Sequence, residues 1–207
     1  ESITNSGGIY GDIDLFRETS YNRVLEDTWV GCYEGIKRCN IVLDNIESVQ
    51  MDETTKKKYK GEMLFIRALT YFNMVRLWGD VPLVIRYFDD PFQTFGIGRS
   101  PVNDVYEQIK NDLIEASKIL PEVPDNKRLG TAVSGSAKTL LGKVYLTLKD
   151  YDNAVKILKE VIDSQQYTFI QDYTELFDVD NKNNSESIFE IQYTEAVTDL
   201  GSAFANL

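Results

Sequence analysis

The chain has 207 residues, of which 43% are apolar and 12% aromatic, enough to bury one sizeable core. It contains 22 Lys and Arg residues and 33 Asp and Glu residues, and the resulting formal charge of -11 disfavours binding to the phosphate backbone of nucleic acid. Histidine is absent, which removes the commonest general base and the commonest zinc ligand. We therefore expect no catalytic residue, no cofactor and no transition-metal site.

The two ends of the chain suggest a longer parent protein. It starts at Glu1 without a methionine or a signal-like segment, and its last residues show no helix cap or terminal element. No apolar run is long enough to span a membrane as a helix.

Residues 1–27 mix glycines with aromatic side chains and hold no period, which predicts a long loop. Apolar residues then recur at three- and four-residue spacing from Thr28 to Glu47, as in an amphipathic helix. Asn40 lies in the apolar stripe of this helix, so we expect it to have a buried hydrogen-bond partner.

A second helix is predicted from Glu53 to Trp78, with Gly79 at its C-terminal cap and an extended apolar segment at 80–85. We expect Arg67 to bond to a neighbouring helix or to the loop carrying Asp80, and so to fix the extended segment. Residues 86–100 have neither helical nor strand spacing and predict a second long loop.

Three further helices follow in the second half of the chain. Ser100 and Pro101 form a suitable N-cap and first-turn pair for the third, which Pro121 and Pro124 end. The fourth, 131–148, and the fifth, 151–164, are separated by two residues only, which forces an antiparallel pair. Phe189, Ile191 and Tyr193 alternate with polar residues and predict a short strand.

The pair of helices within 131–164 matches the tetratricopeptide repeat pattern of about 34 residues. The matching positions are Leu141, Gly142, Tyr145, Tyr151, Ala154 and Leu158. The glycine permits close approach of the two helices, and Ala154 supplies the small residue opposite. We predict a mainly α fold of tetratricopeptide-like hairpins, with long loops and the short strand near the C-terminal end.

Asp178 and Asp180 have the carboxylate spacing that opens a calcium loop. The loop lacks the glycine at its sixth position, and Phe189 stands where the ligating glutamate belongs. A polar turn is the preferred interpretation, and calcium binding is the alternative.

One stretch of sequence carries a specific resemblance. Residues 61–84, GEMLFIRALTYFNMVRLWGDVPLV, resemble the signature of the SusD/RagB family, and similarity continues at 104–121, 137–151 and 187–191. The resemblance implies one N-terminal helical domain over 1–207. It also implies a lipid-anchored protein of the outer membrane surface that binds glycans or other nutrients and delivers them to a SusC-like TonB-dependent transporter. The family's lipid-bearing cysteine and C-terminal half are absent from this sequence, so anchoring and complete binding would belong to the parent.

Sugar rings are bound by flat aromatic side chains flanked by polar groups, and such aromatics must be exposed. Tyr10, Phe16, Arg17 and Tyr21 satisfy this condition in the first loop, which precedes the first helix much as the family's ligand-binding loop does. Packing of these rings beneath the loop, or against the absent C-terminal half, is the alternative. Phe88, Phe92 and Phe95 are second candidates, with the character of loop anchors.

These features favour a non-catalytic nutrient-binding protein with an oligosaccharide ligand. A cytosolic adaptor that grips peptides in a tetratricopeptide groove is the alternative, although Thr139, Lys143 and Thr147 give the repeat helices only a thin basic row. A glycan-cleaving enzyme is the third possibility, but no spacing singles out a pair of carboxylates.

Overall fold

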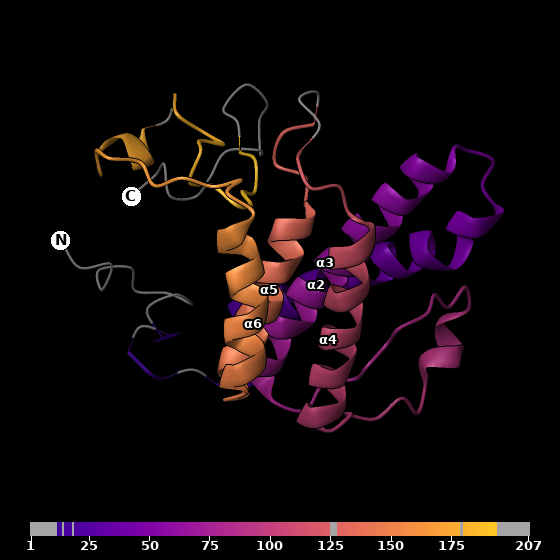
Figure 1. The fold of residues 1–207 in the computed structure, drawn as a ribbon. Coiled ribbons are helices and arrows are strands. Elements are labelled where there is room, and N and C mark those ends of the chain that lie inside the picture. The colour runs from indigo at the N-terminus through magenta and orange to yellow at the C-terminus, as the bar shows by residue number, and fades with distance from the viewer. Residues whose placement is uncertain (1–11, 14, 18, 125–127, 179, 194–207) are drawn as a thin grey trace. The chain divides into compact units, whose positions relative to one another are not determined.

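The computed structural model describes residues 12–13, 15–17, 19–124, 128–178 and 180–193, and its long elements are helices (Figure 1). They are α2 (Arg23–Asn45), α3 (Glu53–Trp78), α4 (Val102–Ile119), α5 (Ser134–Thr147) and α6 (Tyr151–Asp163), with short 3-10 turns at Ile46–Ser48, Pro91–Thr94 and Glu175–Phe177. The mainly α prediction is confirmed.

Two compact units make up the chain. The first comprises residues 1–50 and 66–109, and the second comprises residues 51–65 and 110–207, so both α3 and α4 contribute residues to each unit.

In the first unit, α2 begins earlier than the predicted Thr28. The backbone N–H of Val24 donates to the side-chain oxygen of Asn22 at 2.9 Å, which makes Asn22 the N-cap. The first turns of the helix carry charged, exposed residues, among them Arg23 and Asp27, whose side chains pair at 3.5 Å. No apolar period marks these turns, so the helix start was missed.

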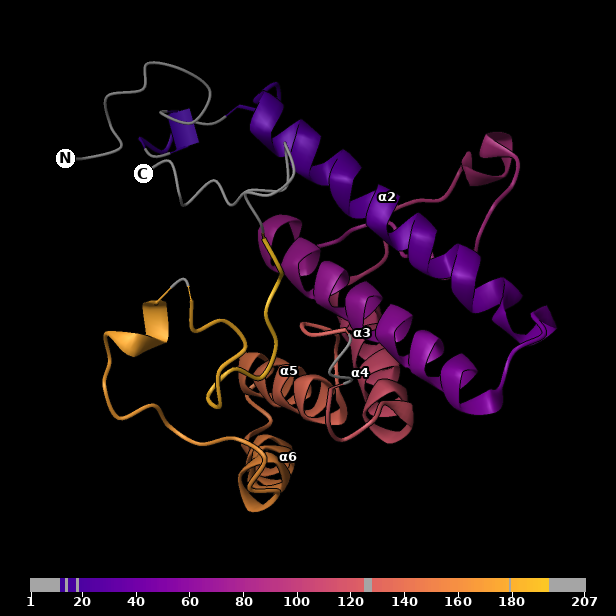
Figure 2. The same ribbon diagram turned by 90° about the horizontal axis from the view of Figure 1, so that it is seen from above.

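Asn40 links α2, α3 and the extended segment that follows α3; Figure 2 shows the two helices side by side. Its side-chain NH₂ donates to the carbonyls of Val84 and Arg86 at 3.0 and 3.2 Å. Arg67 donates to the side-chain oxygen of Asn40 at 2.8 Å and to the carbonyl of Ile85 at 3.1 Å. The buried partner predicted for Asn40 and the anchoring role predicted for Arg67 are both confirmed.

Gly79 ends α3 in the left-handed region, with φ of 69°, and its N–H donates to the carbonyl of Val75. One side-chain oxygen of Asp80 then accepts from the N–H of Val102 at 2.9 Å and so caps α4. Ser100, the predicted N-cap, instead donates its N–H to the carbonyl of Val81 in an isolated bridge. A carboxylate distant in sequence thus takes the capping role that local sequence assigned to Ser100.

In the second unit, α5 and α6 form the predicted antiparallel hairpin, side by side in Figure 1. At Gly142 an added Cβ would overlap the Cδ2 and Cγ atoms of Leu158 unless that side chain shifted. Ala154 is fully buried, and Lys149 makes the tight turn with φ of 61°. The close approach predicted at Gly142 is therefore present, and Leu158 is the residue that faces the glycine.

The predicted strand at Phe189, Ile191 and Tyr193 is wrong. Between residues 180 and 193 the described chain forms no strand, and two of its carbonyls accept from side chains: Ser136 donates to the carbonyl of Ile188, and Lys182 to that of Tyr193. The Phe189 ring packs against Phe65 with centroids 4.9 Å apart. Phe189 therefore anchors this loop, whereas Ile191 and Tyr193 are exposed.

No helix in the part of the chain that the structure describes combines the length and apolar character needed to cross a bilayer.

Candidate functional site

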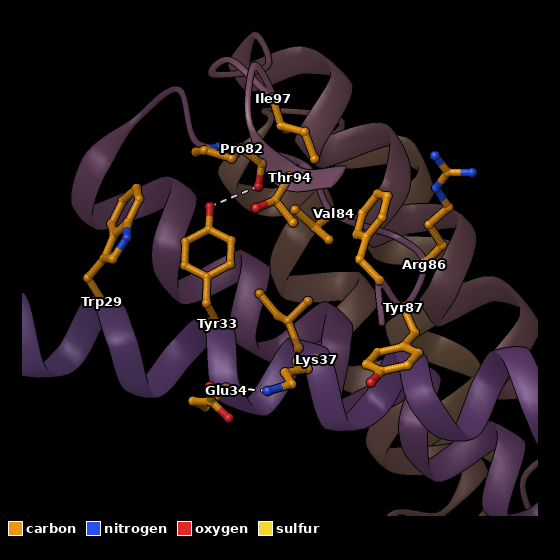
Figure 3. Close-up of a pocket in the computed structure, with 12 residues that line it drawn as sticks. Trp29, Tyr33, Glu34, Lys37, Pro82, Val84, Arg86, Tyr87, Thr94 and Ile97 are labelled. Atoms are coloured by element: carbon orange, nitrogen blue, oxygen red, sulfur yellow. Dashed lines mark hydrogen bonds and ion pairs between the residues drawn. The ribbon is translucent and has the colours of Figure 1, made fainter. Parts of the chain in front are cut away.

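A cavity of about 340 Å³ lies in the first unit between α2 and the segment from Pro82 to Ile97 (Figure 3). Aromatic and aliphatic side chains form most of its wall. The lining residues are Trp29, Tyr33, Glu34, Ile36, Lys37, Pro82, Val84, Arg86, Tyr87, Phe88, Thr94 and Ile97.

One wall of the cavity is a row of side chains from α2. Trp29, Tyr33 and Lys37 are spaced by four residues, so they lie on one helix face, and Figure 3 shows the two rings directed at the segment that carries Pro82. The ring of Trp29 lies 5.1 Å from that of Tyr33 and 5.2 Å from that of Trp78, between centroids. Trp29 is therefore packed between two other rings in this wall.

The hydroxyl of Tyr33 donates to the carbonyl of Pro82 at 2.8 Å, which ties α2 to the opposite wall. Burial raises the pKa of this phenol well above its ordinary value, and the nearby Tyr71 and Cys32 act in the same direction. The hydroxyl therefore stays protonated at neutral pH and keeps its donor role.

The opposite wall supplies charge as well as rings. The guanidinium of Arg86 lies 4.7 Å from the centre of the Phe88 ring, and the backbone N–H of Tyr87 donates to a carboxylate oxygen of Asp44 at 2.6 Å. On α2, Lys37 and Glu34 approach to 3.7 Å. Glu34 is the single carboxylate among the lining residues, so the cavity lacks the carboxylate pair that glycoside hydrolysis needs.

Of the four residues predicted to bind ligand, Phe16, Arg17 and Tyr21 do not line this cavity. Tyr10 lies outside the described residues. Phe16 and Tyr21 are 89% and 92% exposed, and Arg17 is also exposed. Phe16 has φ of 53° in a tight turn, where its N–H donates to the carbonyl of Ile13. The structure thus leaves Phe16, Arg17 and Tyr21 open to solvent on the segment that leads into α2.

Of the three phenylalanines that were second candidates for ligand binding, one lines the cavity and two lie at the surface. Phe88 lines the cavity, whereas Phe92 and Phe95 pack edge to face with centroids 5.4 Å apart and remain largely exposed. Sequence reasoning missed Tyr33 and Tyr87 as cavity residues. The four-residue spacing of Trp29, Tyr33 and Lys37 was a usable signal for one wall, but which segment covers it depends on contacts distant in sequence.

Asp178 and Asp180 form a polar turn. The carboxylate of Asp178 accepts the backbone N–H of Asp180 at 2.9 Å, and its carbonyl accepts that of Asn181. Within the described ranges no group of three or more Cys, Asp and Glu side chains is arranged to hold a metal ion.

The chain is similar to several SusD-like proteins of known sequence. It shares 29% identity over 204 residues with a SusD-like protein of Bacteroides ovatus, covering 89% of this chain and 36% of that protein. It shares 29% identity over 163 residues with the starch-binding protein SusD of Bacteroides thetaiotaomicron, covering 75% and 28%. The chain therefore spans about a third of the length of these relatives.

Solved structures agree with the sequence matches. A laminarin-binding SusD-like protein superimposes with a TM-score of 0.78 at 36% identity, covering 82% of this chain and 38% of that one. A SusD superfamily protein of Bacteroides vulgatus gives 0.84 at 27% identity, covering 90% and 40%. The family model SusD-like_3, described as starch-binding and associating with the outer membrane, matches residues 11–146. This chain belongs to the SusD-like family.

Proposed function

We propose that this chain is part of a non-catalytic glycan-binding protein of the outer membrane surface, lipid-anchored in its full-length form, that delivers an oligosaccharide to a SusC-like TonB-dependent transporter. Family membership over 11–146 supports the outer-membrane setting. The names of similar proteins support the ligand class: one binds starch, one binds laminarin, and one was solved with a xyloglucan oligosaccharide.

The observation that carries the binding role is the exposure of Phe16 and Tyr21 at 89% and 92%. Two flat rings this open on one short segment are available to stack on a ligand. Stacking on the apolar C–H face of a sugar would cover each ring, and Arg17 between them could donate to hydroxyls. The net charge of -11 repels acidic polysaccharides, so the ligand we propose is a neutral glycan.

The cavity beside α2 can hold a second part of the same ligand. Its volume of about 340 Å³ lies near the lower end of the range for small-molecule sites. Tyr87 and Phe88 offer ring surfaces, and Lys37 and Arg86 offer donors at the rim. Ile97 lies on its wall, so a larger side chain there would fill the space.

Calorimetric titration of the intact protein tests the proposal with three neutral ligands: laminarin, xyloglucan and starch oligosaccharides. We expect one of them to bind, and the double variant Phe16→Ala, Tyr21→Ala to weaken it about tenfold or more, since two stacked rings contribute a few kcal/mol. Phe169→Ala is the matched control, because Phe169 is 84% exposed in the other unit. Unchanged affinity of the double variant would place the site elsewhere.

Ile97→Trp separates the cavity from the exposed rings. If the cavity holds part of the glycan, this variant weakens binding although Phe16 and Tyr21 are intact. Co-purification with a TonB-dependent transporter distinguishes surface capture from the adaptor alternative. Recovery with cytosolic proteins only would reject the proposed location.

A further inference from the structure

Trp78, the last residue of α3, does not line the cavity beside α2, yet its ring packs on a residue that does. The centroid of its indole lies 5.2 Å from that of Trp29, and the two ring planes are 89° apart, so the rings meet edge to face. Trp29 lines the cavity, and Figure 3 shows its ring directed at the segment that carries Pro82. Trp78 therefore touches the cavity wall from outside the cavity.

Two neighbouring rings restrict the orientation of the Trp29 indole. Besides Trp78, the ring of Tyr33 lies 5.1 Å away between centroids, at an angle of 55°. The Tyr33 ring is itself held, because its hydroxyl donates to the carbonyl of Pro82. A tryptophan side chain without such contacts moves among several rotamers. Removal of the Trp78 ring therefore takes away one of the two restraints and widens the range of orientations open to Trp29.

The backbone of Trp78 also leads into the opposite wall. Gly79 follows it in the left-handed region, with φ of 69°, and the Gly79 N–H donates to the carbonyl of Val75 at 3.0 Å, which ends α3. The extended segment with Pro82 and Val84, which forms the opposite wall, starts directly after this turn. Trp78 thus lies at the junction of the two walls, where its ring supports one and its backbone leads into the other.

The orientation of an aromatic wall decides how a sugar lies beside it. A sugar ring that stacks on an aromatic side chain lies parallel to it, because its apolar C–H groups face the π surface. The tilt of the Trp29 indole therefore determines which hydroxyls of the sugar point toward the polar groups of the cavity, such as those of Lys37 and Arg86. Neutral glycans differ in the directions of these hydroxyls.

We propose that Trp78 is a positioning residue for glycan binding. It holds Trp29 in the orientation that the cavity shows, and it thereby sets both the affinity of the cavity and its preference among neutral glycans. Trp78 itself makes no contact with the glycan. This inference rests on the proposed function, because it takes the ligand to be a glycan that enters the cavity beside α2.

Calorimetric titration of the intact protein with laminarin, xyloglucan and starch oligosaccharides tests this role through two substitutions. Trp78→Leu removes the ring, and we expect it to weaken binding of the preferred glycan about three- to tenfold, the range that one edge-to-face aromatic pair contributes. The preference for that glycan over the other two should also decrease. Trp78→Phe keeps an aromatic ring against Trp29 and is expected to restore most of the affinity and the preference.

Near-ultraviolet circular dichroism gives a second readout, because it reports the fixed packing of aromatic side chains. We expect the preferred glycan to change the spectrum of the wild-type protein, since Trp29 contacts the ligand. The same glycan at saturation should produce a smaller change in Trp78→Leu. A Trp78 with a structural role alone would lower the melting temperature when replaced and leave the change induced by the glycan intact.

The matched control is Tyr106→Leu. Tyr106 also packs edge to face within the first unit, on Phe72 with centroids 6.4 Å apart, and neither of these rings lines the cavity. We expect Tyr106→Leu to lower the melting temperature as well. Its affinity for the preferred glycan, measured well below that temperature, should equal the affinity of the wild-type protein.

The outcomes separate the positioning role from the proposed function. If Ile97→Trp weakens binding but Trp78→Leu keeps the affinity and preference of wild type, the positioning role is rejected and glycan binding stands. Loss of affinity in Tyr106→Leu equal to that in Trp78→Leu, or no recovery in Trp78→Phe, also rejects it. If wild type binds a glycan that Ile97→Trp binds equally well, the cavity is not the site and the inference is wrong. If wild type binds none of the three glycans, the proposed function is rejected with it.

Discussion

The joint between α2 and α3 in the first unit and the α5–α6 hairpin in the second are both helix pairs, but different forces hold them. The first relies on buried polar groups: Asn40 and Arg67 bond to each other and to carbonyls of residues 84–86. The second relies on close approach at Gly142 and on apolar contacts such as Leu158.

The two helix pairs use different interactions because they hold different parts of the chain in place. The hairpin has only to hold two neighbouring helices together, which non-directional apolar contact does well. The first pair must also fix a segment without regular structure, whose carbonyls need donors when buried. Side chains of α2 and α3 supply those donors, and the same segment forms one wall of the aromatic cavity. Directional bonds therefore position the candidate site.

The largest effect is expected from Arg67→Ala. The side chain is 5% exposed, and its loss leaves the oxygen of Asn40 and the carbonyl of Ile85 without these donors. We expect the free energy of unfolding to fall by about 3 kcal/mol, as for removal of a buried charged partner, measured by urea denaturation. Arg38→Ala, at an exposed position on α2, is the control and should lie within about 0.5 kcal/mol of wild type. An unchanged melting curve with lost glycan binding would make Arg67 a ligand contact instead.

Tyr71→Phe should have the next largest effect. The Tyr71 hydroxyl accepts from the N–H of Val84 at 2.7 Å and donates to its carbonyl at 3.0 Å, and the side chain is fully buried. Removing one oxygen costs about 1–3 kcal/mol, because the Val84 N–H loses its partner. Tyr173→Phe, at an exposed ring, should be neutral. Equal stability of both variants would show that the polar network is not what fixes the segment.

A smaller effect is expected in the hairpin from Gly142→Ala. The added methyl would overlap Leu158, a flexible side chain that can shift, so the overpacking cost of about 1–3 kcal/mol is partly offset by the better helix propensity of alanine, about 1 kcal/mol. Gly35→Ala in α2 meets nothing within 4 Å and should stabilise the protein slightly. If both substitutions stabilise, close approach does not hold the hairpin.

The hairpin could be predicted from sequence because its signals are local. Two residues between two periodic segments require an antiparallel pair, and the glycine and alanine positions follow from the repeat. For Asn40 the sequence predicted only that a polar residue in an apolar stripe must have a hydrogen-bond partner. Val84 and Arg86, its acceptors, lie more than forty residues away and could not be identified from spacing.

The candidate site was less predictable than the fold, for a related reason. An exposed aromatic such as Tyr21 can be predicted from its place in a segment without periodicity. A cavity depends on two walls, and that between α2 and 82–97 is set by bonds such as Tyr33 to Pro82, which join positions distant in sequence. The prediction of a strand near Phe189 was wrong for the same reason, because alternation does not reveal whether a partner strand exists.

The smallest effect is expected from Tyr33→Phe and concerns how the free energy of unfolding changes at alkaline pH. Burial raises the pKa of Tyr33 above the ordinary value of about 10, so the folded protein keeps a proton that the unfolded chain releases. The unfolded state then binds fewer protons, and stability that is complete below about pH 10 is lost as the pH rises above it.

Tyr33→Phe removes this contribution, so its free energy of unfolding should fall less steeply between about pH 9 and about pH 11 than that of wild type. Tyr106 and Tyr167, whose pKa values burial also raises, keep a residual slope in the variant. Parallel pH profiles for the two proteins would mean that Tyr33 ionises in the folded state as readily as in the unfolded chain, and the bond to Pro82 would then not hold the cavity wall at alkaline pH.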